Sequence, residues 1–189
     1  MQAKQHTIIY WTLFVCNQWN VYIAATSKGL CFVGSKDFDE VVLWAERKFP
    51  QHTLVQDDKV LHPYVAELEE YIKGDRKEFT MPIDVQGTPF QLAVWNALRE
   101  IPYGETYSYS DIAERIQKPD SVRAVGTAIG TNPVLITIPC HRVIGKNGKL
   151  TGFRGGLEMK KQLLSLEKGI KWGERITKRV YVSQNSFSP

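Results

Sequence analysis

Three consecutive residues, Cys140, His141 and Arg142, could do chemistry together. A cysteine attacks other molecules as its thiolate, and a neighbouring basic side chain can favour that charged form. Adjacent side chains of an extended chain point in opposite directions, so Cys140 and His141 can cooperate only through a bent backbone or an intervening water. Pro139, which precedes the cysteine, is compatible with a fixed turn. The tripeptide alone leaves a reactive and a structural Cys140 equally open.

The other cysteines point away from metal or disulfide chemistry. Cys16 and Cys31 lie inside apolar segments with no histidine at ligand spacing, so we expect them to be core residues. Three cysteines at wide spacing exclude a disulfide scaffold and a four-cysteine zinc module. No protease signature surrounds Cys140, and the segment 145–149 has the wrong spacing for a phosphate-binding loop. We therefore expect no metal site, and the sequence contains no dinucleotide-binding fingerprint.

Length and charge limit the class of protein. The chain of 189 residues is 43% apolar and 23% charged, which is typical of one or two globular domains. It contains no apolar run long enough to span a membrane and no signal peptide, so we expect a cytoplasmic protein. Residues 1–85 contain nine basic and twelve acidic side chains, whereas residues 86–189 contain fifteen and eight. A basic second half suggests contact with a polyanion, although a merely solvated basic surface also explains this charge.

The first half must supply a mixed α/β scaffold. Alternating and β-branched residues predict strands, and Ser27-Lys28-Gly29 has the composition of a tight turn between two of them. Apolar residues at helical spacing predict two helices, the first capped by Ser35 or Asp37 and the second ended by Gly74. The predicted strands are Thr7–Cys16, Val21–Thr26 and Leu30–Val33, and the predicted helices are Phe38–Phe49 and Val60–Ile72.

The second half must position Cys140 and is mainly helical. A segment rich in proline and glycine, residues 79–87, is the candidate linker. Two short helices separated by a tight turn have the sequence form of a helix-turn-helix, although a tightly packed internal helix explains the small residues of the second equally well. The buried run Val134–Pro139 is predicted to be extended and to lead into Cys140, and 145–149 to be a turn. The predicted helices are Phe90–Glu100, Tyr109–Ile116, Val122–Gly130 and Leu157–Glu167.

Several motifs in order resemble the O6-alkylguanine-DNA alkyltransferases. Ile138-Pro139-Cys140-His141-Arg142-Val143 is similar to the alkyl-acceptor motif of that family. The surrounding motifs arrive in family order and spacing; they are Phe90–Trp95, Ile101–Thr106, Arg123–Gly126, Asn132-Pro133, Gly155-Gly156-Leu157 and Leu163-Leu164 with Glu167. The resemblance covers residues 80–169 strongly and the first 80 residues only in outline.

The resemblance implies a fold and a reaction. It implies an α/β plus α protein, with a ribonuclease-H-like α/β domain in residues 1–85 and a helical, winged-helix-like DNA-binding domain in residues 86–169. Residues 170–189 are basic and then serine-rich, and we expect a flexible tail. The implied reaction is single-turnover transfer of an alkyl group from O6-alkylguanine, and from O4-alkylthymine, in double-stranded DNA to Cys140. The protein would act as a monomer without a cofactor.

The family's site residues map onto this sequence one by one. Cys140 would be the nucleophile, and His141 would take its proton through a water while Glu167 keeps that imidazole positively polarised and so lowers the thiol pKa. Asn132 would order the turn, and Tyr109 would donate to the leaving purine. The backbone of Val143 and of the segment Phe153–Arg154 would read the base edges. On the second helix, Arg123 would fill the stack left by a flipped base, and small residues would let the helix enter the minor groove; these are Ala124, Gly126 and Thr127.

The sequence departs from the family pattern in three respects, and two other functions fit parts of it. Phe153 stands where many relatives have tyrosine, and the metal-binding set of some relatives and the multi-cysteine zinc domain of larger ones are not evident. One rival is a non-catalytic lesion-binding protein, against which Cys140 argues because such proteins lack the acceptor thiol. The other is a helix-turn-helix regulator with an incidental cysteine, which would prefer one DNA sequence and tolerate loss of Cys140.

Overall fold

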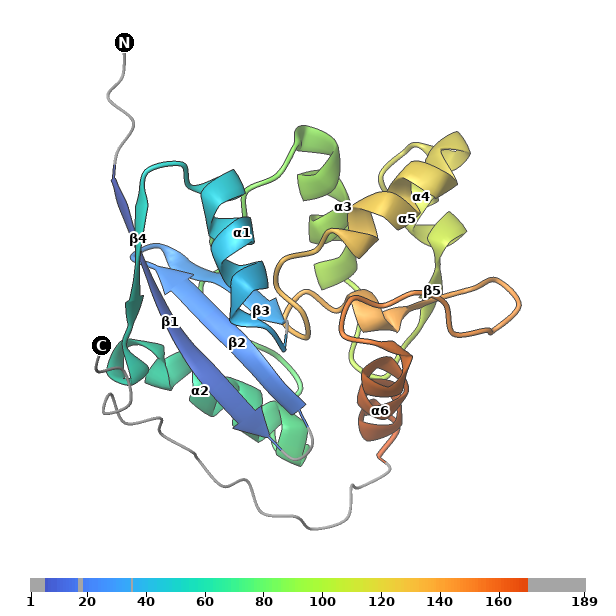
Figure 1. Ribbon diagram of the computed structural model, residues 1–189. Coiled ribbons are helices and arrows are strands. Elements are labelled where there is room, and N and C mark those ends of the chain that lie inside the picture. The colour runs from blue at the N-terminus through green and yellow to red at the C-terminus, as the bar shows by residue number, and fades with distance from the viewer. Residues whose placement is uncertain (1–5, 17–18, 35, 170–189) are drawn as a thin grey trace.

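A computed structural model describes residues 6–16, 19–34 and 36–169, and the predicted flexible tail, residues 170–189, lies outside the described residues. The chain begins with a four-stranded sheet in the order β3-β2-β1-β4 (Figure 1). The first three strands form an antiparallel meander, and β4 pairs parallel with β1. The strands are β1 (Thr7–Cys16), β2 (Trp19–Thr26), β3 (Gly29–Gly34) and β4 (His52–Gln56). The three predicted strands are therefore present.

The strand β4 was not expected from the sequence. It is a short segment of five residues, none of which is buried, and it follows the end of the first helix directly. Its parallel partner β1 lies more than thirty residues earlier in the chain, so no local hairpin pattern predicts β4. The helix between β3 and β4 supplies the crossover that a parallel pair requires.

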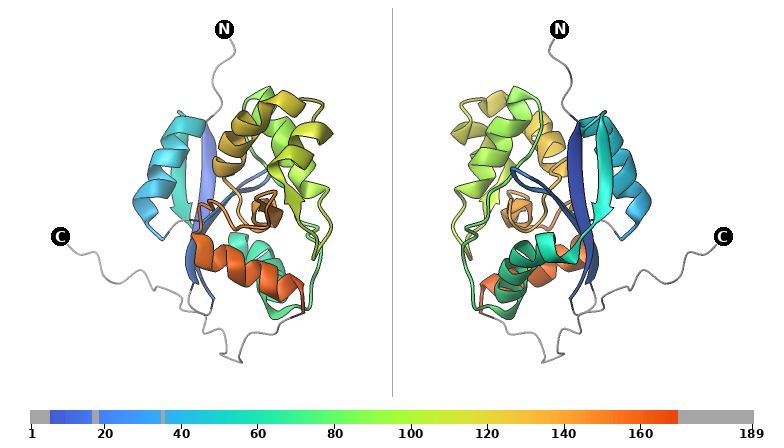
Figure 2. Two further views of the ribbon diagram at one scale, coloured as in Figure 1. Left: turned by 90° about the vertical axis from the view of Figure 1, so that its right-hand side faces the viewer. Right: turned by 90° about the vertical axis from the view of Figure 1, so that its left-hand side faces the viewer.

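Two helices cover opposite faces of this sheet (Figures 1 and 2). They are α1 (Phe38–Lys48), which is capped by Asp37, and α2 (Asp58–Lys73), which is ended by Gly74 in a left-handed conformation with φ of 83°. Val41 and Ala45 of α1 bury against one face, and Leu61, Val65 and Leu68 of α2 bury against the other. The α2 face belongs to a core that continues into the second half of the chain.

The second half consists mainly of helices with one two-stranded pair. Its elements are α3 (Pro89–Arg99), β5 (Tyr107–Ser108), α4 (Tyr109–Arg115), the 3-10 turn η1 (Pro119–Ser121), α5 (Val122–Gly130), the 3-10 turn η2 (Cys140–Arg142), β6 (Val143–Ile144) and α6 (Leu157–Glu167). Thr88 and Ser108 form capping boxes at α3 and α4, which is why those helices begin there. Ser121 forms no side-chain cap for α5. Helices α4 and α5 pack on each other as the helix-turn-helix pattern predicts.

The segment Val134–Pro139 is buried as expected but is not extended. The amide of Thr137 donates to the Leu135 carbonyl at 2.8 Å, and the amide of Ile138 donates to the Val134 carbonyl at 3.2 Å. Ile136 has φ of 72°, which is rare for a β-branched residue. The prediction failed because an apolar run reports burial, whereas these turns depend on contacts distant in sequence.

The edge strand β3 joins the two halves of the molecule. The Val33 amide donates to the Pro133 carbonyl at 2.9 Å, and the Leu135 amide donates to the Val33 carbonyl at 3.0 Å. On the same strand, Leu30 pairs with Ile83 of the predicted linker. The backbone that leads to Cys140 is thus hydrogen-bonded to the sheet of the first half.

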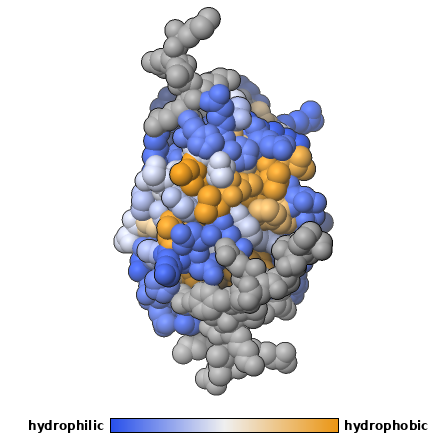
Figure 3. Space-filling view, turned by 60° about the vertical axis from the view of Figure 1, so that its left-hand side comes forward, coloured by the Kyte–Doolittle hydropathy of each residue, from blue (hydrophilic) through white to orange (hydrophobic). Residues whose placement is uncertain are grey.

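The outer face of the sheet is only partly covered. Helix α1 is eleven residues long, and aromatic side chains such as Trp11 and Tyr22 remain partly accessible beside it. Figure 3 shows hydrophobic residues gathered within a mostly hydrophilic side of the molecule. Among the described residues of this half, the large exposed apolar side chains are Ile8, Leu43 and Val60.

Candidate active site

Cys140 begins the turn η2 and is held there by Asn132. The cysteine is only 3% exposed, and the Asn132 side-chain amide donates to the Ile138 carbonyl at 3.0 Å and to Cys140 Sγ at 3.1 Å. The Asn132 carbonyl oxygen accepts from the Val134 amide at 2.9 Å. One buried side chain therefore orders both ends of the turned segment. The bent backbone that cooperation between Cys140 and His141 requires is present as a 3-10 turn.

His141 and Glu167 form a buried pair behind the cysteine. The Nε2 atom of His141 lies 2.7 Å from Oε1 of Glu167, and their side chains are 0% and 1% exposed. An ionised carboxylate only accepts hydrogen bonds, so Nε2 carries the proton and Nδ1 is the basic nitrogen. Among the described residues, Nδ1 is buried and has no hydrogen-bond partner. A basic nitrogen with this environment is suited to receive a proton through a water.

Glu167 also accepts hydrogen bonds from three further groups, Arg142, Gly104 and Tyr71, to which the sequence analysis assigns no such contact. Arg142 donates Nε to both carboxylate oxygens at 3.1 and 3.0 Å, and its Nη2 donates to Oε1 at 3.0 Å. The Gly104 amide donates to Oε2 at 3.0 Å, and the Tyr71 hydroxyl of α2 donates to Oε1. Arg142 neutralises the carboxylate, and its Nη1 donates to the Ile101 carbonyl at 2.6 Å. The motifs in the sequence include Arg142 and Gly104 without indicating their bonds to Glu167, and they do not include Tyr71.

Burial leaves the resting thiol and imidazole neutral. Desolvation raises the pKa of Cys140 despite the Asn132 hydrogen bond and the nearby charges of Arg154 and Lys160, which lower it. Desolvation likewise lowers the pKa of His141 despite its hydrogen bond to Glu167. The resemblance implies a lowered thiol pKa, whereas in the resting protein desolvation outweighs the groups that lower it. Glu167 does raise the pKa of His141, as the resemblance implies, but desolvation exceeds this effect too. The hydrogen bonds from His141 and Arg142 lower the pKa of Glu167 to about 2, so it is ionised.

A cavity of about 430 Å³ opens onto Cys140. Tyr109 lines it, and its hydroxyl lies 2.9 Å from Oγ1 of Thr151. Phe153 and Arg154 form another part of the wall, so these expected pocket residues meet Cys140 in space. The remaining lining residues are Gly126, Ile129, Gly130, Gly145, Thr151 and Gly152. Glycines keep this wall open, and the cavity volume falls within the range of small-molecule sites.

Two cations next to the site bind backbone carbonyls. The Nζ atom of Lys160 is buried and donates to the carbonyls of Val143 and Thr151 at 2.6 and 2.8 Å. The Val143 carbonyl therefore points toward Lys160. Val143 is not one of the described residues that line the cavity. The Nη2 atom of Arg154 donates to Val33 and Pro133 across the junction with β3. The sequence patterns assign no role to Lys160, and the family resemblance implies one only for the backbone of Arg154.

The outward face of α5 carries the expected DNA-contacting residues. Arg123, Ala124 and Thr127 are exposed on this helix, whereas Val125 and Ala128 are buried. Gly126 lies between these faces, and a Cβ atom there would lie 3.7 Å from the Tyr109 ring. The helix thus presents small residues and one arginine outward while Gly126 lines the cavity with Tyr109.

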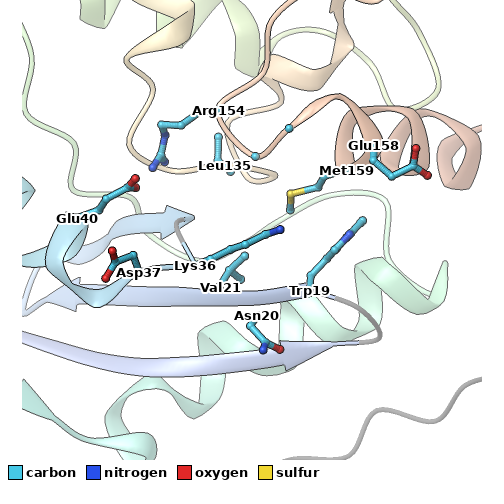
Figure 4. A pocket seen from close by; sticks show the side chains of 12 residues that line it. Trp19, Asn20, Val21, Lys36, Asp37, Glu40, Leu135, Arg154, Glu158 and Met159 are labelled. Atoms are coloured by element: carbon cyan, nitrogen blue, oxygen red, sulfur yellow. The ribbon is translucent and has the colours of Figure 1, made fainter.

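A second cavity of about 580 Å³ lies between the sheet and the loop before α6. Figure 4 shows Trp19 and Val21 of β2 on one side, and Arg154 and Met159 on the other. The charged side chains around it have both signs; they are Lys36, Asp37, Glu40, Arg154 and Glu158. Of the site residues that the family resemblance implies, only Arg154 lines this cavity.

Two negative findings apply to the described residues alone. No group of three histidine, cysteine or acidic side chains among them is placed to bind a metal ion. None of their helices has the length and apolar character needed to cross a bilayer. Cys16 and Cys31 are buried in strands, and burial raises the pKa of Cys16 to about 11, as suits an unreactive core thiol.

Comparisons with known proteins match both halves of the chain. A family model described as the ribonuclease-like domain of 6-O-methylguanine DNA methyltransferase matches residues 9–85, and the DNA-binding domain of that family matches residues 89–169. A methylated-DNA–protein-cysteine methyltransferase of Bacillus subtilis, described as inducible, is 62% identical over 170 residues, which cover 89% of this chain and 94% of the relative. A methylated-DNA–protein-cysteine methyltransferase of Methanosarcina acetivorans is 40% identical and covers 84% and 98%.

The solved structures agree with the sequence matches. The crystal structure of Mycobacterium tuberculosis OGT in complex with DNA superposes with a TM-score of 0.75 at 36% identity. The alignment covers 86% of this chain and 94% of that one. The likeness therefore extends over both halves of the molecule.

Proposed function

The chain belongs to the 6-O-methylguanine DNA methyltransferase family, and we propose that it restores O6-alkylguanine in DNA by taking the alkyl group onto Cys140. The observation that carries the choice of Cys140 is its position on a cavity wall, with the buried pair of His141 and Glu167 behind it. Cys16 and Cys31 are core residues of strands, so they offer no comparable acceptor.

The transfer requires one proton movement and one displacement. The Cys140 thiol gives its proton, through a water, to Nδ1 of His141, and Glu167 stabilises the imidazolium that forms. The thiolate Sγ then bonds to the alkyl carbon while the bond from that carbon to O6 breaks. The displaced guanine anion takes up the proton that the imidazolium gives back through water, so neutral guanine is restored within the DNA and the protein keeps a thioether. Each molecule therefore acts once, and no cofactor enters the balance.

Two further groups support the transition state. The Asn132 amide donates to Sγ, which favours the thiolate over the thiol. Tyr109 lines the same cavity as Cys140. Its hydroxyl can give up its hydrogen bond with Thr151 and donate to the purine instead, as negative charge builds on the leaving base. O4-alkylthymine carries its alkyl group on a comparable exocyclic oxygen and is the second substrate that we propose.

The target base must leave the duplex to reach Cys140. The base edge that carries O6 is paired and stacked inside double-stranded DNA, so the nucleotide has to be flipped into the cavity. The exposed face of α5 supplies Arg123 to occupy the vacated stack, and Ala124 and Thr127 are small enough for the helix to approach the minor groove. We propose that the protein does this as a monomer, with residues 1–85 and 86–169 as its two domains.

Mass spectrometry tests the proposal directly. Wild-type protein incubated with duplex DNA containing O6-methylguanine should gain one methyl group, located on the peptide that contains Cys140. Cys140→Ala should gain none while it keeps its affinity for the duplex. A wild-type protein that binds the lesion and stays unmodified would instead be a non-catalytic lesion-binding protein. Strong preference for one undamaged sequence, unaffected by Cys140→Ala, would indicate a transcriptional regulator.

A further inference from the structure

The Tyr71 hydroxyl reaches the candidate active site from the first half of the chain. Tyr71 lies near the end of α2 and is completely buried. Its hydroxyl donates to Oε1 of Glu167 and lies 3.3 Å from Nε2 of His141. Burial and the neighbouring carboxylate raise the pKa of Tyr71 well above its ordinary value, so the hydroxyl keeps its proton and remains a donor. None of the sequence motifs included this residue.

The ring of Tyr71 is fixed independently of its hydroxyl. Its centroid lies 5.1 Å from that of Phe79, and Tyr103 meets it edge-on at 5.9 Å. The ring also belongs to the continuous core between α2 and the second half. A phenylalanine at this position would keep these contacts and lose only the hydroxyl, so the two contributions can be separated by experiment.

The two oxygens of Glu167 have different partners. Oε2 accepts from Arg142 and from the Gly104 amide, which belong to the second half of the chain. Oε1 accepts from His141 and Arg142, and the Tyr71 hydroxyl joins them there. Tyr71 is therefore the donor from the first half of the chain that shares with His141 and Arg142 the oxygen on which the imidazole depends. Each donor on Oε1 reduces the negative charge available to the others.

We propose that Tyr71 is a positioning residue for alkyl transfer, whose hydroxyl directs Oε1 of Glu167 toward His141 Nε2 and limits how tightly that carboxylate holds the imidazole. This inference rests on the function proposed above for Cys140, His141 and Glu167. It gives the first half of the molecule a part in the chemistry, because α2 tunes the base that takes the thiol proton.

The charged and titratable groups around His141 allow a direction to be assigned. Glu167 and Lys160 approach from α6, Arg142 from η2, and Tyr71 from α2, while Tyr103 interacts with Glu167 from the loop before β5. Without the Tyr71 hydroxyl, Oε1 has more charge left for the Nε2 proton, so the imidazolium becomes more stable. The direct contact of the hydroxyl with Nε2 is longer and opposes this effect only weakly.

The test is the pH dependence of single-turnover transfer in Tyr71→Phe. Full-length wild-type and variant proteins are mixed with saturating O6-methylguanine duplex between pH 5 and 9, and methylated protein is quantified by intact mass. We expect a rate about three- to tenfold lower near neutral pH and an acidic limb displaced upward by about half a pH unit or more. Tyr64→Phe removes a hydroxyl from the same helix without a described contact to the site, and it should match the wild type.

The outcomes separate this inference from the proposed function. An acidic limb in Tyr71→Phe that coincides with that of the wild type overturns the positioning role, whatever the change in rate. Histidine ¹⁵N NMR gives a second measurement, in which the His141 signal should titrate at a higher pH in the variant than in the wild type. A wild-type protein that never acquires a methyl group would overturn the proposed function itself, before any comparison of variants.

Discussion

The side-chain NH₂ group of Asn132 donates to Sγ of Cys140 at 3.1 Å, and the side-chain oxygen of Asn132 accepts from the Val134 amide. The same side chain thus shapes the turned segment and favours the thiolate. Both groups are buried, so solvent does not replace either hydrogen bond when it is lost.

Asn132→Asp should separate these two tasks. Aspartate keeps an acceptor for Val134 but brings negative charge to Sγ, which disfavours the thiolate and should slow transfer at least about tenfold. Single-turnover rates on lesion-bearing duplex measure this. Asn147→Asp is the matched control, because Asn147 is exposed and its oxygen accepts only a local hydrogen bond from the Lys149 amide. Equal rates for the two variants would contradict a role of Asn132 at the sulfur.

Glu167→Gln should change how stability depends on pH. The pKa of Glu167 is lowered to about 2 in the folded protein, below its ordinary 4.5, so its ionisation stabilises the fold above about pH 4.5. That contribution, about 3 kcal/mol, is lost as the pH falls toward 2. Urea denaturation at several pH values should show wild type and variant converging in acid. Glu158→Gln on the exposed face of α6 is the control, and a constant gap for Glu167→Gln would refute the coupling.

Arg154→Ala should loosen the junction between the two halves. Its guanidinium donates to carbonyls of β3 and of the segment before Cys140, so the free energy of unfolding should fall by about 1–3 kcal/mol. Gly34→Ala tests the same contact from the other side, because a Cβ atom there would lie 2.7 Å from Arg154 Nη2. Denaturant titrations of both variants and the double variant should be non-additive. Fully additive losses would show that the two residues act separately.

Arg123→Ala should impair base flipping more than the chemical step. The residue is exposed on α5 and lies outside the cavity at Cys140, so the free modified base should react at nearly the wild-type rate. On duplex DNA the rate should drop about tenfold or more, because the vacated stack is left empty. Equal losses on duplex and free base would exclude this role. Affinity for duplex should also weaken steeply with salt, as phosphate contacts require.

Local sequence patterns predicted much of the scaffold. The predicted fold class, an α/β domain followed by a helical DNA-binding domain, is confirmed by the family matches and the structural neighbours. Helical spacing and caps placed α1 to α6 within a few residues. The strand β4 and the turns around Ile136 were missed because both depend on partners distant in the sequence.

The sequence predicted site residues only where they lie within the family motifs. The structure brings Cys140, His141, Asn132 and Glu167 together, and their roles remain predictions to be tested. The contact of Tyr71 with the site could not be predicted, because an aromatic residue on an amphipathic helix has the pattern of an ordinary core residue. The buried position of Lys160 could not be predicted either, since a helical lysine normally extends into solvent. In both cases the decisive fact is a partner from another part of the chain.

The neutral state of the resting thiol has a consequence for the lifetime of the protein. A molecule that can react only once is wasted if peroxide oxidises its sulfur before any damaged base arrives. Peroxide attacks thiolates far faster than thiols, and Cys140 is both protonated and almost inaccessible while the protein waits. Burial of Cys140 is therefore expected to slow its oxidation while the protein waits for a damaged base.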